Sequence, residues 1–257
     1  MNLEVIFSQK LLLPYSAIGA KGQVRIDRLL NMFQDVASLQ CDQFKISGFD
    51  MAKKQLKWVV SRYQTKIHRS PHWMEPLEIQ TWRAPWKNLY ELRQFSIVNQ
   101  DKEELISALG IWILVKASNS KPVRLTPHLP KALLEPADSC PELIKNDHNL
   151  KDFDHESEFK IRVLDLDLNQ HVNNTVYAQW AIEALPPEIL FKFSPTDCTV
   201  SYLKESFFPG TILSCVKIEH HPDTLTTRHS IFLKSTMIKL ANLTMSWKKN
   251  IENEYPH

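Results

Sequence analysis

Hydrophobic positions in the first half of the chain change from a helical to a strand-like spacing. Between residues 26 and 40, apolar side chains recur on one helical stripe: Ile26, Leu29, Leu30, Phe33, Val36 and Ala37. From Lys57 onward the chain is rich in β-branched and aromatic residues, and short polar stretches interrupt these runs. We therefore predict a helix at 26–40, followed by strands at 58–67, 76–82, 91–98 and 105–117.

The second half of the chain repeats this order. Residues 174–185 form an apolar helical face that Asn173 or Asn174 can cap and that Pro186-Pro187 ends. Strand-like runs follow at 198–208, 211–220, 226–234 and 237–247. A helix followed by several antiparallel strands, occurring twice in matching order, predicts two structural repeats.

Each predicted repeat has to bury the apolar stripe of its helix. A curved antiparallel sheet wrapped around the helix does so, because one sheet face and the helix then share a core. Pairing the two sheets edge to edge would remove exposed edges. We therefore predict an α+β fold of two helix-in-sheet units, with repeats at 1–120 and 157–257. A linker at 121–156, which contains prolines and charges, joins them.

The composition disfavours several classes of protein. Five glycines in 257 residues allow no dinucleotide-binding, P-loop or nucleophile-elbow motif. A net charge of +2 does not argue for a nucleic-acid partner. The four cysteines form no C-x-x-C pair and are expected to be free, at least partly buried thiols in a reducing compartment. The N-terminus has no signal-peptide pattern and no apolar run could span a bilayer, so we expect a cytoplasmic protein.

Polar residues are densest at 165–174, immediately before the second predicted helix. Asp167, Asn169 and His171 are spaced by two, so an extended segment would point them to the same side. The unpaired N–H groups of the helix start would add a site for a developing oxyanion. From spacing alone, a hydrolytic site and a polar loop with an asparagine cap are equally supported. A metal site is disfavoured, because asparagine is a poor ligand and His171 has no second histidine or cysteine nearby in sequence.

The segment VLDLDLNQHVNNTVYAQWAIEALP resembles the active-site segment of the fatty acyl-ACP thioesterases, which release fatty acids from acyl carrier protein. Five positions of the family motif D-x-N-x-H-x-x-N-x-x-Y are present: Asp167, Asn169, His171, Asn174 and Tyr177. A second family segment, an aromatic strand ending in Glu and then Cys, is similar to residues 202–206. Glu205 falls on the family Glu and Ser206 on the family Cys. The resemblance covers nearly the whole chain and implies a tandem, or double, hot-dog fold.

The resemblance also implies that the second repeat is catalytic and needs no cofactor and no metal. Its implied catalytic residues are Asp167, Asn169, His171 and Glu205. Either Glu205 or His171 would take a proton from water, or a carboxylate would attack the substrate, and the sequence leaves these alternatives open. Asp167 would hold His171 or a donor at the helix start in place.

Three further positions are expected to contact the substrate. Asn173 and Asn174 supply amides at the helix start which, with Asn169, would orient water or stabilise the oxyanion. Ser206 stands where the family has a cysteine, and an unactivated serine is a poor nucleophile. A Cys-His-Asn mechanism is therefore disfavoured for this chain.

The first repeat lacks this polar cluster, and the resemblance implies that it lines the acyl-chain pocket. Met32, Phe33 and Trp58 are candidates, because methionine and aromatic side chains suit an apolar tunnel. For any one of these residues, ordinary core packing is the better-supported explanation.

The implied partner, acyl carrier protein, is acidic, so its docking surface is expected to be basic. Basic residues of the first predicted sheet are Lys66, Arg69, Arg83, Lys87 and Arg93, of which the last three are the docking candidates. A solvated sheet face explains them equally well. Rival interpretations are a hot-dog acyl-CoA thioesterase, a non-enzymatic acyl-binding module and a hydratase. The sequence decides neither the acyl chain length nor whether the protein forms a homodimer.

Overall fold

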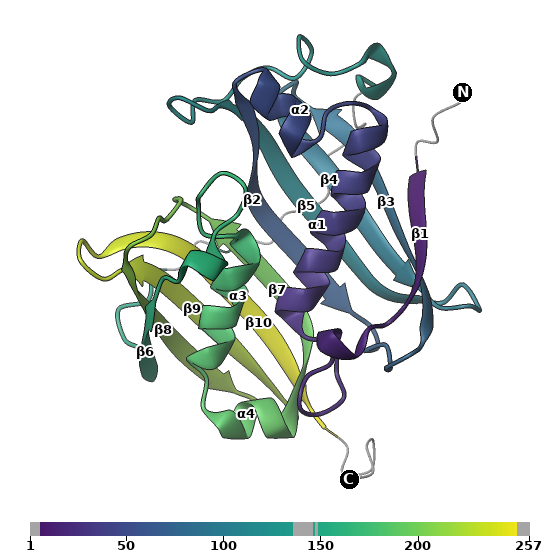
Figure 1. Ribbon diagram of the computed structural model, residues 1–257. Helices are drawn as coiled ribbons and strands as arrows, with labels where there is room; N and C mark the ends of the chain where they lie inside the picture. Colours follow the sequence, from purple (N-terminus) through teal and green to yellow (C-terminus); the bar gives the residue numbers. More distant parts are fainter. Residues whose placement is uncertain (1–5, 136–145, 147–148, 251–257) are drawn as a thin grey trace.

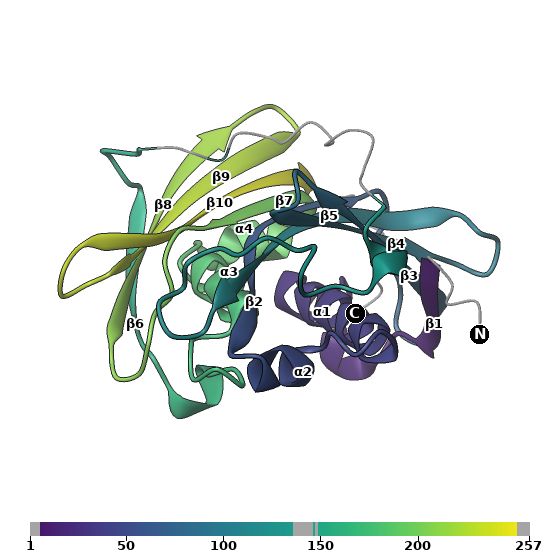
Figure 2. The ribbon, with the colours of Figure 1, turned by 90° about the horizontal axis from the view of Figure 1, so that it is seen from above.

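A ten-stranded antiparallel sheet curves around two long helices in the computed structural model, which describes residues 6–135, 146 and 149–250 (Figure 1). The first half of the chain forms β1 (Ile6–Leu12), α1 (Ile26–Gln43), α2 (Gly48–Lys53), β2 (Leu56–Ile67), β3 (Pro76–Trp86), β4 (Tyr90–Val98) and β5 (Glu104–Lys116). The second half forms β6 (His155–Lys160), α3 (Asn174–Glu183), α4 (Pro187–Lys192), β7 (Phe193–Tyr202), β8 (Thr211–His220), β9 (Thr224–Leu233) and β10 (Ile238–Lys249). Seen from above, α1 and α3 lie within the concave face of the sheet (Figure 2).

The helices and strands predicted from the spacing of apolar residues are present. All six residues of the predicted stripe on α1 are buried. Asn173 caps α3, since its side-chain oxygen accepts the Thr175 N–H at 3.1 Å. Two predicted strands have wrong bounds. The strand predicted at 198–208 is β7 at Phe193–Tyr202, so residues 203–208 leave the sheet, and the strand predicted at 76–82 extends to Trp86. The sequence pattern also missed β1 and β6, because most of their residues are exposed and give little alternation of polar and apolar positions.

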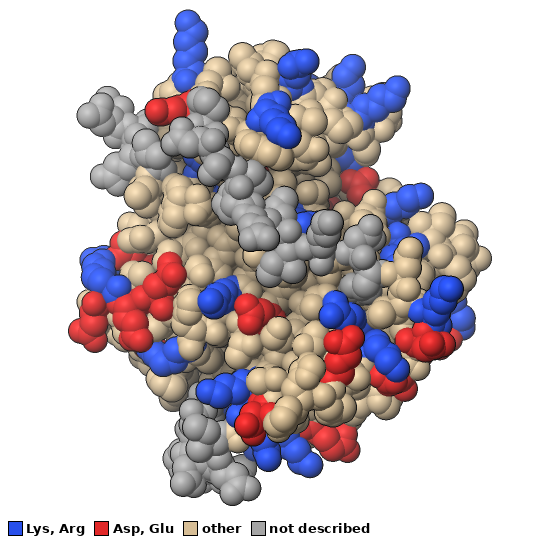
Figure 3. All heavy atoms as spheres, turned by 180° about the vertical axis from the view of Figure 1, so that it is seen from behind, with Lys and Arg blue, Asp and Glu red and all other residues tan. Residues whose placement is uncertain are grey.

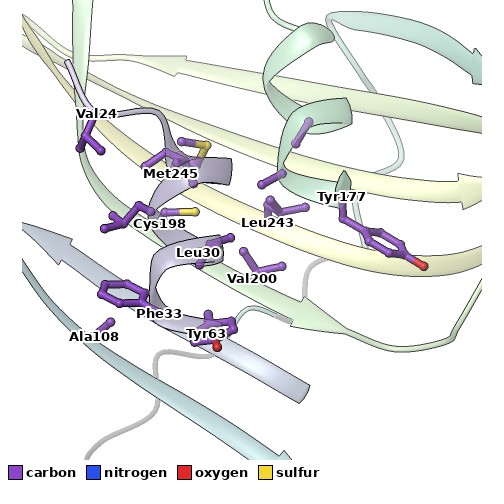
Figure 4. Packing of buried hydrophobic residues seen from close by; sticks show 14 of the residues in the cluster. Val24, Leu30, Phe33, Tyr63, Ala108, Tyr177, Cys198, Val200, Leu243 and Met245 are labelled. Carbon is purple, nitrogen blue, oxygen red and sulfur yellow. The ribbon is translucent and has the colours of Figure 1, made fainter. Parts of the chain in front are cut away.

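The two half-sheets join where β2 pairs with β7. The strand order is β1-β3-β4-β5-β2-β7-β10-β9-β8-β6, and the junction runs from Arg62 opposite Ser201 to Lys66 opposite Asp197. Figure 4 shows side chains of both halves packed into one core, with Phe33 and Tyr63 near Val200. The edge pairing predicted between the two sheets is therefore confirmed, and the fold is the tandem hot-dog.

Both helices are entered through the same backbone turn. A single β-bridge closes each turn, between Ile18 and Val24 in the first half and between Leu166 and Val172 in the second. The N–H of Gly19 donates to the Gln23 carbonyl at 2.8 Å, and the N–H of Asp167 donates to the His171 carbonyl at 2.7 Å. In the first repeat, glycine and glutamine thus occupy the places of Asp167 and His171.

The predicted linker at 121–156 is described only in part, since residues 136–145 and 147–148, including Cys140, lie outside the described residues. Its first part packs on the first repeat, where Leu125 and Leu129 join a cluster with Phe44 and Met51. The other three cysteines are free thiols, with Cys198 and Cys215 buried and Cys41 half-buried. Across the described ranges, every helix is too short or too polar to cross a membrane.

Candidate active site

His171 and Glu205 lie side by side near the start of α3. His171 belongs to the turn before that helix, and Glu205 follows the end of β7. The His171 Nδ1 atom lies 3.2 Å from Glu205 Oε1, and 15% and 28% of the two side chains are exposed. The Phe207 ring packs edge-on to the imidazole, with ring centroids 4.8 Å apart. A half-buried imidazole beside a carboxylate can accept a proton from water and later return it.

Asp167 shapes the turn that presents His171. Its Oδ1 atom accepts the N–H groups of Asn169 at 2.8 Å and of His171 at 3.1 Å. Gln170 adopts a positive φ of 61°, so the chain reverses here. The expectation of an extended segment with three side chains on one side is therefore wrong, because these backbone hydrogen bonds favour a turn. Asn169 is exposed near the turn's tip, and in the described part of the chain its side chain bonds to neither His171 nor Glu205.

The start of α3, at Asn174, follows His171 by three residues and carries further polar groups. Asn173 is occupied as the helix cap. The Asn174 carbonyl accepts the Tyr202 hydroxyl at 3.1 Å. The Asn174 Nδ2 atom is buried and has no hydrogen-bond partner within the described residues. A buried donor without an acceptor is unfavourable, and a substrate oxygen would satisfy it.

Ser206 is held away from a nucleophilic role. Its side chain is 2% exposed, and its Oγ atom lies 2.7 Å from the Tyr177 hydroxyl. Burial raises the pKa of Tyr177 to about 12, so this phenol stays protonated near neutral pH and cannot act as a base for the serine. Burial also raises the pKa of the Cys198 thiol to about 12, which disfavours a thiolate there.

Replacing Ser206 by alanine is expected to leave kcat within about threefold of the wild-type value, because the lost group is a packing hydroxyl. The measurement is steady-state turnover, with the thermal midpoint as a control for folding. A folded Ser206→Ala protein with no turnover would instead make Ser206 the nucleophile.

Two polar residues of the first half reach this site and were missed by sequence reasoning. The Lys57 Nζ atom lies 2.8 Å from Glu205 Oε1 and 3.1 Å from Oε2, and the Lys57 side chain is 8% exposed. Ser120 Oγ lies 3.5 Å from Glu205 Oε2. Lys57 stands 148 residues from Glu205 along the chain, so no local motif marks it. Only the pairing of the repeats brings the two residues together.

The predicted acyl-pocket residues occupy two separate parts of the first repeat. Phe33 is fully buried and stacks on Phe95, with ring centroids 4.7 Å apart, and Met32 packs against the same core. Trp58 belongs to a different cluster and donates its indole N–H to the Ile46 carbonyl at 2.9 Å. These contacts are those of core residues, and a lining role for them stays a prediction.

Two of the three predicted docking residues are buried, so that part of the prediction is wrong. Arg83 is ion-paired with Glu91, and both side chains are 3% exposed. Arg93 donates to Gln40 Oε1 at 2.6 Å, on the helix side of the sheet. Side chains alternate between the two faces of a strand, and Arg93 lies two residues before the buried Phe95. Arg93 therefore points to the same, inner face, which the prediction of a surface position did not take into account. Lys87 is exposed, in agreement with the prediction.

The fold and the imidazole–carboxylate pair define a double hot-dog protein whose site lies near the N-terminus of its second central helix. Family models agree with this class: the acyl-ACP thioesterase N-terminal domain matches residues 4–133, and the C-terminal domain matches residues 148–249. The chain belongs to the acyl-ACP thioesterase family.

Curated relatives and solved structures are consistent with this membership. The chain is 29% identical over 216 residues to the chloroplastic acyl-[acyl-carrier-protein] hydrolase FATB2 of Cuphea viscosissima, covering 78% of this chain and 52% of that protein. It is 25% identical to the chloroplastic oleoyl-acyl carrier protein thioesterase of Coriandrum sativum, and the match covers 86% of this chain and 65% of that protein. The chain thus spans about half to two thirds of the length of these relatives.

Two solved structures share the fold. The 12:0-ACP thioesterase of Umbellularia californica superposes with a TM-score of 0.81 at 19% identity, covering 96% of this chain and 95% of that one. An acyl-ACP thioesterase of Bacteroides thetaiotaomicron also superposes with a TM-score of 0.81, at 16% identity. The match covers 96% of this chain and 100% of that one.

Proposed function

We propose that the protein hydrolyses the thioester between a fatty acyl chain and acyl carrier protein, giving a free fatty acid and the carrier thiol. The observation that carries this proposal is the 3.2 Å approach of His171 Nδ1 to Glu205 Oε1 near the start of α3. Family membership supports the same reaction, because the matched relatives are named as acyl-ACP hydrolases and thioesterases.

The reaction needs one water molecule and one site for a proton. The His171–Glu205 pair takes a proton from water while the oxygen of that water bonds to the thioester carbonyl carbon. The resulting oxyanion is placed near the Asn174 Nδ2 group and the N–H groups of the helix start. The C–S bond then breaks, and the stored proton goes to the departing sulfur to give the thiol. The fatty acid leaves after this step.

We assign the acyl chain to the first repeat, as the family resemblance implies. Met32, Phe33 and Trp58 are the candidate contacts. For the chain to enter, some of their present core contacts have to open, so these residues are proposals for binding and have no part in the chemistry.

The carrier docking surface is better placed at the rim of the site than on the arginines of β3 and β4. Exposed lysines lie in the segments that carry or adjoin Lys57, Ser120 and Glu205: Lys53, Lys54, Lys116, Lys121 and Lys204. Their proximity follows from the backbone, since Lys116 N–H donates to the Lys121 carbonyl at 3.0 Å and Ser120 reaches Glu205. On the opposite, outer face of the molecule, lysine, arginine and acidic side chains are interspersed (Figure 3).

Reversing two of these charges is expected to weaken binding of the carrier. In the Lys54→Glu/Lys121→Glu protein, KM for acyl-ACP should rise about tenfold at low salt and much less at high salt, with kcat nearly unchanged. The check is a salt series of steady-state kinetics. Lys10→Glu on β1 is the matched control, because Lys10 is also exposed but lies on the outermost strand. Equal KM values for the double variant and the control would remove this surface from consideration.

The decisive test of the function is release of free acid from a panel of acyl-ACPs of different chain lengths, run beside the matching acyl-CoAs. Higher kcat/KM on the carrier substrates supports the proposal. Higher values on acyl-CoA would make the protein an acyl-CoA thioesterase with the same chemistry. Binding without turnover on every substrate would favour an acyl-binding module.

A further inference from the structure

Lys57 is a buried cation that the first repeat inserts beside the carboxylate of the second. It lies at the start of β2, just beyond the part of that strand that pairs with β7. Its Nζ atom is within hydrogen-bond distance of both Glu205 oxygens, at 2.8 and 3.1 Å. With only 8% of its side chain exposed, Lys57 has lost most of its hydration. A charge in such a place requires a partner, and Glu205 provides it.

This pairing limits what Glu205 can do. A carboxylate next to a cation is stabilised in its charged form and is a weaker base and a weaker nucleophile than a free one. Its Oε1 atom faces Lys57 on one side and His171 Nδ1 on the other. An ionised carboxylate only accepts hydrogen bonds, so Nδ1 carries the proton. The Nε2 atom of the neutral imidazole then keeps its lone pair.

We propose that Lys57 is a positioning residue that holds Glu205 as an anion against His171 Nδ1, so that His171 Nε2, and not Glu205, takes the proton from water. This assignment rests on the proposed hydrolysis. In it, the second repeat supplies the groups that react with water, and the first repeat supplies the cation that orients them. The other polar groups around the pair are Ser120 from the loop after β5, Asp167 from the turn before α3 and Tyr177 from α3. Tyr177 is neutral at working pH, and the Asp167 oxygen is engaged by backbone N–H groups. The rim lysines, Lys204 among them, are exposed to solvent, so Lys57 is the buried cation in direct contact with the pair.

Removing the cation leaves the Glu205 charge uncompensated beside His171, which favours the imidazolium. In Lys57→Met, the midpoint of the His171 titration should therefore move to higher pH than in the wild-type protein. The acidic limb of the kcat/KM profile should move with it, and kcat near neutral pH should fall by about tenfold. Lys57→Arg keeps the charge and should restore both the midpoint and most of the activity.

The experiment is an NMR titration of the histidine ring signals in the full chain, with the His171 signal assigned by its absence in His171→Ala. Lys57→Gln is a second neutral variant, which keeps a hydrogen-bond donor and should shift the midpoint as Lys57→Met does. Lys248→Met, an exposed lysine of β10, is the control and should shift nothing. The thermal unfolding midpoint of each variant is measured as well, to check that the variant is folded.

A lysine that only fastens the two repeats together would lower the thermal midpoint without moving the His171 titration. An unmoved titration in either folded neutral variant therefore overturns the proposal. A shift in both neutral variants that Lys57→Arg reverses supports it. The titration is measured without substrate, so it tests the role of Lys57 independently of catalysis. A wild-type protein that releases no fatty acid would contradict the proposed function and leave the titration result valid.

Discussion

Replacing His171 by alanine is expected to lower kcat by about a thousandfold or more, with the fold intact. The imidazole is the group at this site that can both accept and return a proton near neutral pH, and general acid–base catalysis of this kind contributes about 10²–10⁴-fold. Its side chain is only half-buried at the mouth of the turn, so its loss should cost little stability. The measurement is release of free fatty acid from acyl-ACP under single-turnover conditions.

The chain supplies its own matched control for that experiment. Gln23 occupies the position of His171 in the corresponding turn of the first repeat. Gln23→Ala should leave kcat within about threefold, since that turn carries no imidazole–carboxylate pair. A similar loss of activity in both variants would point to a structural effect of these turns and would contradict a catalytic role for His171.

Replacing Glu205 by glutamine is expected to lower kcat by about a thousandfold while KM changes little. Glutamine has nearly the same shape but lacks the charge that orients His171 and stabilises the imidazolium formed during the reaction. The change also leaves Lys57 without its partner, so some loss of stability is expected in addition. Steady-state kinetics together with a thermal midpoint separate the two effects.

The control for the charge itself is Glu183→Gln, which changes an exposed carboxylate near the end of α3. That variant should keep its activity. If Glu205→Gln turned over substrate at the wild-type rate, the carboxylate would be a packing partner of Lys57, and the division of labour proposed for the site would fail.

Most of the fold could be predicted because its elements carry strong local periodicity. The stripe of α1 repeats with helical spacing from Ile26 to Ala37, and each of these residues packs under the sheet. The edge strand β1 gave no such signal, since its side chains are mostly exposed and its position depends on pairing with β3. Local patterns therefore predicted the core elements, and long-range pairing decided the rest.

The candidate site was predicted in part for the same reason. His171 and Glu205 lie in segments that resemble family motifs, and the structure brings them together. The shape of the turn was not predicted, because the hydrogen bonds of Asp167 to the backbone outweigh the spacing of side chains. Lys57 was missed because its partner lies in the other repeat. The prediction of a surface Arg83 is wrong because its strand position faces inward and the buried Glu91 compensates its charge.

The matching turns before α1 and α3 show that two repeats of one chain can share a backbone form and present different side chains. In the first repeat, Gly19 has no side chain, yet the same backbone hydrogen bond closes the turn. The backbone therefore keeps this shape without an aspartate and without a histidine. Two identical subunits would carry every such change twice. Because one polypeptide carries both turns, the second can present His171 while the first presents Gln23, which two identical subunits could not do.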